Sequence, residues 1–177
     1  MATFAMSEAL TIILKKNDPT SAAKQVSLTE LGSIKINKEE RRKMYRTIPR
    51  SSMMGFLIGV LPGAGATIAS FLAYGMERNL VKDEEKEKFG KGSVNGLSAP
   101  ETANNAACSG SFVPMLTLGI PGSGTTAVML GALLGFGIQP GPRLYMTNPE
   151  IFWSVIMSMY VGMVILLILN LPLIPYI

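Results

Sequence analysis

The sequence predicts an all-α integral membrane protein in which some transmembrane helices are discontinuous or re-entrant half-helices broken at Pro-Gly motifs. Two observations lead to this prediction. The 177 residues are 48% hydrophobic, and residues 92–177 carry only three charged side chains, Glu101, Arg143 and Glu150. The same stretch is rich in glycine and proline, which interrupt helices. Lipid offers the backbone no hydrogen bonds, so broken helices at membrane depth survive only beside protein or a polar cavity.

Three segments carry no charge, namely residues 51–76, 102–142 and 151–177. Each is longer than the roughly 18 to 20 apolar residues that indicate a membrane span. The chain has no histidine and one cysteine, Cys108. Histidine-dependent triads and dyads, most zinc sites and a disulfide framework are therefore excluded within it. We expect a membrane protein that is not an enzyme.

The N-terminal part divides into two regions by composition. Residues 1–14 read as the end of an apolar helix, and residues 15–50 as a basic arm. Between positions 35 and 50 there are seven basic residues and two acids, Glu39 and Glu40. Cytoplasmic loops are enriched in lysine and arginine, so we expect the arm to be cytoplasmic. Nucleic-acid binding is disfavoured, because the two acids interrupt the basic cluster and a membrane segment follows it directly.

Residues 51–78 are expected to form a broken helix or a re-entrant hairpin with its tip at 62–65. The break splits the segment into residues 51–61 and 65–78. Eleven helical residues rise only about 16 Å, half of a roughly 30 Å hydrocarbon core. We favour the hairpin over a single discontinuous span. Residues 79–100 are then a charged, glycine-rich loop.

Residues 101–142 are expected to form a second broken-helix unit with its tip at 121–124. Residues 143–177 would supply a loop and a C-terminal transmembrane helix, with Trp153 and Tyr176 as interfacial aromatics near its two ends. Gly-x-x-x-Gly spacings at 55–59 and 131–135 would let helix backbones approach closely, although such spacings are frequent by chance in glycine-rich sequence.

An internal repeat is the most specific feature of the chain. The sequence Pro-Gly-Ala-Gly-Ala-Thr at 62–67 recurs as Pro-Gly-Ser-Gly-Thr-Thr at 121–126. Each break would expose backbone N–H groups at the start of the next half-helix, and a helix N-terminus attracts anions. Paired broken helices near the bilayer midplane are a known transporter arrangement. The alternative is that each Pro-Gly is only a turn. The predicted substrate-binding residues are Gly63, Ala64, Gly65, Thr67, Gly122, Ser123, Gly124, Thr125 and Thr126.

A second motif contains Glu101, Asn104 and Asn105. If a helix starts after Pro100, their side chains lie over one face and could converge as oxygen ligands. Such oxygens suit Na⁺, and a desolvated Glu101 could carry a proton instead. The alternative is that Glu101 stabilises a helix N-terminus and the asparagines bond to other helices.

Coupling to a cation has an energetic reason. Importing a dianion against 100 mV costs about 4.6 kcal/mol, at roughly 2.3 kcal/mol per charge. Neutral helix ends cannot supply this free energy, whereas co-transported Na⁺ or H⁺ can. We expect no cofactor besides this coupling ion.

Three long stretches resemble the large membrane subunit of the tripartite tricarboxylate transporters, the TctA family. They are residues 55–77, 89–124 and 137–142, and residues 4–8 also resemble the family's segment before its cytoplasmic arm. The resemblance implies that Gly63, Gly65, Thr67 and residues 122–125 line the carboxylate site. It also places Glu101, Asn104 and Asn105 in the family's Glu-x-x-Asn-Asn motif.

The resemblance further implies a multi-pass carrier in the bacterial inner membrane that imports citrate-like tricarboxylates or related carboxylates. Its expected partners are a small membrane subunit, a periplasmic solute-binding protein, the lipid bilayer and a first half of the carrier, because this chain is similar to the second half only. The alternative functions are a non-transporting membrane scaffold or assembly subunit, or an inactive fragment of the carrier.

Overall fold

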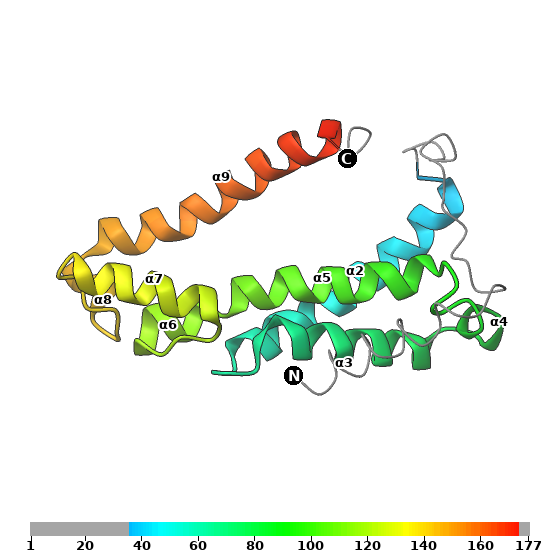
Figure 1. Ribbon diagram of the computed structural model, residues 1–177, viewed down its shortest axis with the longest axis horizontal. Coiled ribbons are helices and arrows are strands. Elements are labelled where there is room, and N and C mark those ends of the chain that lie inside the picture. The colour runs from blue at the N-terminus through cyan, green and yellow to red at the C-terminus, as the bar shows by residue number, and fades with distance from the viewer. Residues whose placement is uncertain (1–35, 174–177) are drawn as a thin grey trace, which may run out of the picture. The chain divides into compact units, whose positions relative to one another are not determined.

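The computed structural model describes residues 36–173, and every regular element in that range is a helix. The predicted all-α fold is confirmed to that extent. The predicted regions 1–14 and 15–35, and Tyr176, lie outside the described residues. The described helices belong to one compact unit that begins at Lys38 (Figure 1). They are α2 (Lys38–Val60), α3 (Gly65–Leu80), α4 (Asp83–Lys86), α5 (Val94–Gly110), α6 (Phe112–Leu118), α7 (Gly124–Gly135), α8 (Leu144–Thr147) and α9 (Pro149–Leu173).

Helix α2 corrects the predicted boundary at position 50. The last part of the expected arm and the first apolar half-helix form one continuous helix of 23 residues. The composition changes from charged to apolar at Ser51, but the helix does not end there. Lysine, glutamate and arginine are good helix formers, so the charged residues before Ser51 continue the same helix. Pro49 lies inside α2, where it costs the carbonyl of Tyr45 its helical partner. Both residues are exposed.

The chain turns back on itself between α2 and α3. Thr47, in the first half of α2, hydrogen-bonds Glu77 near the end of α3, so the two helices are antiparallel. Residues 61–64 connect them. Gly63 and Gly65 have φ values of 82° and 70°, which side chains with a Cβ rarely adopt. Placement of this helical hairpin within a membrane stays a prediction.

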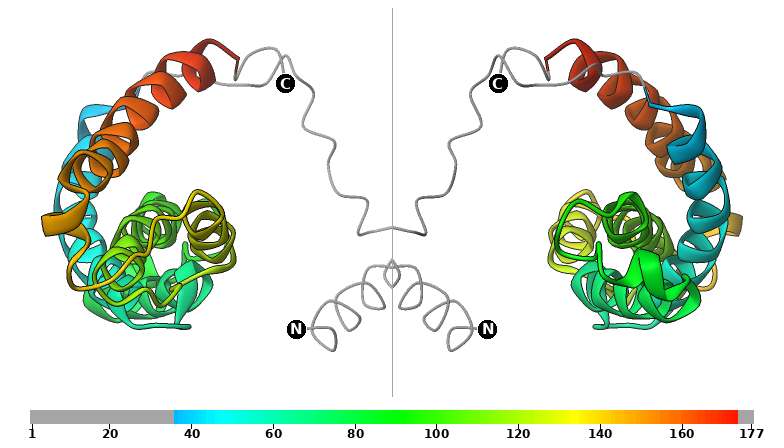
Figure 2. Two further views of the ribbon diagram at one scale, coloured as in Figure 1. Left: turned by 90° about the vertical axis from the view of Figure 1, so that its left-hand side faces the viewer. Right: turned by 90° about the vertical axis from the view of Figure 1, so that its right-hand side faces the viewer.

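Helices α2, α3 and α5 pack through small residues that recur every fourth position. Helix α5 runs parallel to α2, and both views of Figure 2 show α3 and α5 grouped beside the second half of α2. A Cβ added at Gly55 or Gly59 would lie 2.6 Å from the Cα of Ala103 or Ala107. Such contacts allow the close backbone approach that small-x-x-x-small spacing provides. The buried positions that follow this spacing are Thr47, Ser51, Gly55 and Gly59 in α2, Ala69, Ala73 and Glu77 in α3, and Asn95, Ala99, Ala103 and Ala107 in α5.

The expected loop at 79–100 is wrong in part, because α3 extends to Leu80, α4 is helical and α5 starts at Val94. Ser93 caps α5 by accepting a hydrogen bond from the Gly96 N–H at 3.1 Å. Pro100 therefore lies inside α5 and does not begin it. Packing of Ala99 and Ala103, both fully buried, holds the helix together on either side of this proline.

The second half of the described chain has its own apolar core. Gly119, with φ at 69°, ends α6, and residues 119–123 lead into α7. Helix α8 and the start of α9 then pack against α6 and α7. The buried members of this core are Met115, Leu116, Leu133, Leu144 and Val155.

Helix α9 is the one helix of the described residues that is long and apolar enough to cross a membrane. Its 25 residues rise about 37 Å. Pro172 lies inside its last turn. The expected spans within 51–76 and 102–142 are each divided among shorter helices. Helix α7 is apolar but has only 12 residues.

Candidate functional site

The second Pro-Gly tip packs against the end of α2, next to the first tip. A Cβ added at Gly122 would lie 2.8 Å from the Cβ of Ser111 and 3.4 Å from the carbonyl oxygen of Gly59. Gly59 is in the last turn of α2, and α3 begins six residues later at Gly65. Helices α3 and α7 consequently start near one junction, from which they run in opposite directions (Figure 1).

The start of α3 is open. Gly63 and Thr67 are exposed, while Ala64 and Gly65 are half-buried. No side chain caps this helix end among the described residues. The first N–H groups of a helix lack intrahelical partners, so this end can offer hydrogen bonds to an anion.

The start of α7 is different, because its own side chains cap it. The Ser123 N–H donates to the Thr126 Oγ1 at 2.8 Å, and the Thr126 N–H donates to the Ser123 Oγ at 3.2 Å. Thr126 and Gly122 are buried, whereas Gly124 and Thr125 are exposed. Ser123 and Thr126 were predicted to bind substrate, but here their hydroxyls form a capping box. Gly124 and Thr125 are the better placed of the predicted residues in this tip.

A pocket of about 460 Å³ lies between α3 and α5. It contains Thr67 from the first tip and Asn104 from the Glu-x-x-Asn-Asn motif, together with Ser70. The Asn104 side-chain amide donates to the Ser70 Oγ at 3.3 Å. These groups are neutral and polar, which suits a ligand that must bind and leave again. Phe71, Tyr74 and Pro100 complete the lining.

Glu101 and Asn105 lie on another face of α5 from Asn104. Both are exposed and line a pocket of about 420 Å³ with Ser52 and Ser109. The Asn105 amide donates to the backbone carbonyl of Glu101 at 2.9 Å, not to its carboxylate. The structure thus brings Glu101 and Asn105 together and separates them from Asn104. Within residues 36–173, no three Asp, Glu, Cys or His side chains form a metal-binding group.

Comparison with known proteins identifies the family. The family model described as "Tripartite tricarboxylate transporter TctA family" matches residues 1–177. The chain belongs to the TctA family. The resemblance drawn from the sequence is therefore confirmed. TctA proteins are membrane transporters and not enzymes, and the family name implies a tripartite system with other subunits.

Two curated relatives come from Agrobacterium vitis. An uncharacterized 52.8 kDa protein in the TAR-I ttuC' 3' region is 41% identical over 159 residues, which cover 90% of this chain and 31% of the relative. An uncharacterized protein in the TAR-II ttuC' 3' region is 49% identical over 120 residues, which cover 68% of this chain and 49% of the relative. The chain thus spans about a third and about half of these relatives. No solved structure matches it.

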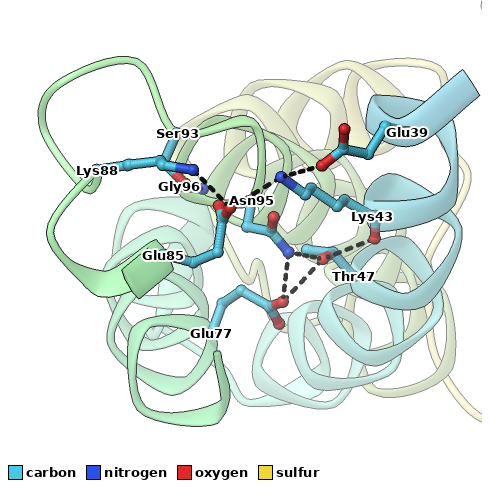
Figure 3. Close-up of polar contacts among 9 residues, drawn as sticks. All are labelled: Glu39, Lys43, Thr47, Glu77, Glu85, Lys88, Ser93, Asn95 and Gly96. Carbon is cyan, nitrogen blue, oxygen red and sulfur yellow. Dashed lines mark hydrogen bonds and ion pairs between the residues drawn. The ribbon is translucent and has the colours of Figure 1, made fainter. Parts of the chain in front are cut away.

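Sequence reasoning about this TctA chain missed a buried polar network at the other end of the three-helix bundle (Figure 3). The Glu77 Oε1 accepts hydrogen bonds from Thr47 at 2.8 Å, Arg50 at 2.8 Å and Asn95 at 3.0 Å. Glu77 is fully buried, and among residues 36–173 its Oε2 has no hydrogen-bond partner. Glu77 lies four residues after Ala73, so it continues the buried every-fourth pattern of α3. That spacing was the available signal, but Glu77 was placed within the expected half-helix 65–78 and assigned no role.

Lys43 extends this network toward α4. Its Nζ lies 2.9 Å from Glu85 and 3.2 Å from Glu39. Hydrogen bonds to Glu85, and then to Glu39, raise the pKa of Lys43 above its ordinary value. Hydrogen bonds from Lys88 and then Lys43 lower the pKa of Glu85. Both groups are therefore held in their charged forms, which ties α4 to the first half of α2.

Proposed function

We propose that this chain is part of a secondary active importer of tricarboxylates such as citrate, or of related carboxylates, in the bacterial inner membrane. It would act with a small membrane subunit, a periplasmic solute-binding protein and the first half of the same carrier. The supporting observation is the junction at which Gly122 meets Gly59, because it places the second tip against the last turn of α2, which leads into the start of α3. Two helix N-termini directed at one place favour an anion there.

The carboxylate would be held by neutral groups. Backbone N–H groups at the open start of α3 and at Gly124 would act together with the hydroxyls of Thr67 and Thr125. Neither tip contains arginine or lysine. Binding by dipoles and hydroxyls avoids a fixed ion pair, so the substrate can be released to the cytoplasm. The pocket that joins Thr67, Ser70 and Asn104 gives the substrate room beside the first tip.

Replacing Thr67 or Thr125 by valine tests this site. Each change keeps the shape of the side chain and removes one hydroxyl. A hydrogen bond to a charged group contributes about 1.5 to 3 kcal/mol, so we expect the KM for citrate uptake to rise roughly tenfold to a hundredfold. Uptake of labelled citrate is measured in cells that express the chain within its complete transport system.

Thr147→Val is the matched control for these two variants. Thr147 is exposed, and its hydroxyl donates to the Arg143 carbonyl one turn away and accepts from the side-chain amide of the neighbouring Asn148. Its loss is expected to leave uptake unchanged. If all three valine variants transport citrate with the KM of the unaltered carrier, the site is wrong and the non-transporting scaffold function is favoured. Ser123→Ala is a poorer test, because it would also remove the cap of α7 at a cost of about 1 kcal/mol.

We further propose that Glu101 carries the coupling cation, either Na⁺ or H⁺, with Asn105 beside it and Asn104 acting at the substrate pocket. Glu101→Gln removes the charge and keeps the size of the side chain. We expect this variant to lose the stimulation of uptake by Na⁺ or by low external pH. Glu150→Gln, an exposed carboxylate in the first turn of α9, is the matched control. Equal Na⁺ and pH responses in both variants would remove Glu101 from coupling.

A further inference from the structure

A second pocket, of about 390 Å³, lies between the first half of α2, the end of α3 and α4. It is separate from the Pro-Gly tips, since it borders the opposite end of the hairpin. Five cations and three carboxylates line it, which leaves a surplus of two positive charges. The charged lining residues are Arg42, Lys43, Arg46, Arg50, Lys82, Glu39, Glu77 and Glu85.

Three of the five cations have no ion pair within the described residues. Lys43 is held by Glu39 and Glu85, and Arg50 is held by Glu77. Arg42, Arg46 and Lys82 remain. All three are exposed, and they approach the pocket from both the first half of α2 and the residues between α3 and α4. A guanidinium group presents a planar set of donors that matches phosphate oxygens.

The border of this pocket is apolar. Leu80 and Val81 belong to its lining, and the side chain of Leu80 is 55% exposed. The apolar part of α2 begins directly after Arg50, while α3 is apolar up to Met76. The pocket therefore lies where the charged ends of two helices meet their apolar lengths. A ligand with a phosphate at one end and hydrocarbon at the other fits both features.

We propose that this pocket binds the phosphate headgroup of an anionic lipid of the cytoplasmic leaflet, with Arg42, Arg46 and Lys82 as its ligands. Clusters of basic residues on the cytoplasmic side of membrane helices attract acidic lipids. The lipid would hold the start of α2 at the membrane surface, and its acyl chains would lie along Leu80. This site does not depend on the carboxylate being transported.

The test measures binding of phosphatidylglycerol to the purified full chain in neutral detergent, by competition with a fluorescent phosphatidylglycerol. Phosphatidylcholine and inorganic phosphate serve as comparison ligands. The triple variant Arg42→Gln, Arg46→Gln, Lys82→Gln should bind phosphatidylglycerol roughly a hundredfold more weakly, because each interfacial cation contributes about fivefold. The triple variant Arg41→Gln, Arg78→Gln, Lys91→Gln removes the same charge from exposed positions outside the pocket and should keep its affinity.

Three results would overturn the proposal. Equal losses in the two triple variants would indicate general charge attraction. Displacement of the fluorescent lipid by inorganic phosphate as effectively as by phosphatidylglycerol would identify a soluble phosphate as the ligand. The unaltered protein supplies a measurement that needs no variant, since phosphatidylglycerol should raise its thermal unfolding midpoint and phosphatidylcholine should not. The absence of that difference would exclude the site.

Discussion

Gly59→Ala is expected to destabilise the three-helix bundle, although it adds only one methyl group. The new Cβ would lie 2.6 Å from the Cα of Ala107 and 2.8 Å from its carbonyl carbon. These are backbone atoms of a buried helix, so they cannot rotate away as a flexible side chain would. Overpacking of this kind costs about 1 to 3 kcal/mol, and more where backbone must move. The thermal unfolding midpoint of the purified protein in detergent should fall clearly.

Gly75→Ala is the matched control, and its expected effect has the opposite sign. Gly75 is also helical, but nothing lies within 4 Å of its added Cβ. Alanine there removes conformational freedom from the unfolded chain and should stabilise the protein by about 0.4 to 1 kcal/mol. If the two variants unfold at the same temperature, the close contact of α2 with α5 is not present in the protein.

Gly59→Ala should also impair transport. Because the carbonyl oxygen of Gly59 lies beside Gly122, a shift of α2 away from α5 moves the support of the second tip. Citrate uptake per folded molecule should therefore fall in Gly59→Ala and not in Gly75→Ala. The two measurements together separate a loss of folded protein from a displaced junction.

The sequence was most informative where local chemistry decides the structure. Helix α2 ends just before Pro62 and α7 begins just after Gly122, near the positions that the Pro-Gly motifs indicated. Ser123 lies in the second motif and caps α7. Proline and glycine act on their own backbone, so their effects can be inferred without knowing what packs around them.

Sequence reasoning failed where tertiary packing decides. Of the two Gly-x-x-x-Gly spacings that were expected to bring helices together, the structure buries the glycines of one, Gly55 and Gly59, while Gly131 and Gly135 are exposed. Both spacings have the same local chemistry, and the difference is that α5 offers a matching row of alanines. A helix was expected to start after Pro100. Instead, α5 starts at Val94, where Ser93 caps it, and Ala99 is buried in its packing before the proline. For the same reason the separation of Asn104 from Glu101 was not foreseen, because it depends on which face of α5 contacts α3.

Glu77→Ala is expected to have the second large effect. It removes the acceptor shared by Thr47, Arg50 and Asn95, two of which are buried side chains with no charge. Removing one partner from a buried charged network costs about 3 to 5 kcal/mol. The side chain of Arg50 is 42% exposed and can be hydrated after the change, so we expect a value near the lower end. Chemical denaturation monitored by circular dichroism measures the loss.

Further variants of Glu77 and Arg50 identify what Glu77 contributes. Glu77→Gln keeps an oxygen that can accept from Thr47 and Asn95 but loses the charge that pairs with Arg50, so it should cost less than Glu77→Ala. Arg50→Met should be costly on its own, because it leaves the buried carboxylate without its cation. Arg50→Met should therefore cost little when Glu77→Met is already present, as replacement of a whole buried pair by apolar residues is often nearly neutral. Strictly additive effects of the two methionine substitutions would mean that the ion pair does not link α2 to α3.

Glu84→Ala is the control for Glu77→Ala. It removes an exposed carboxylate of α4 and should change the free energy of unfolding by no more than about 0.5 kcal/mol.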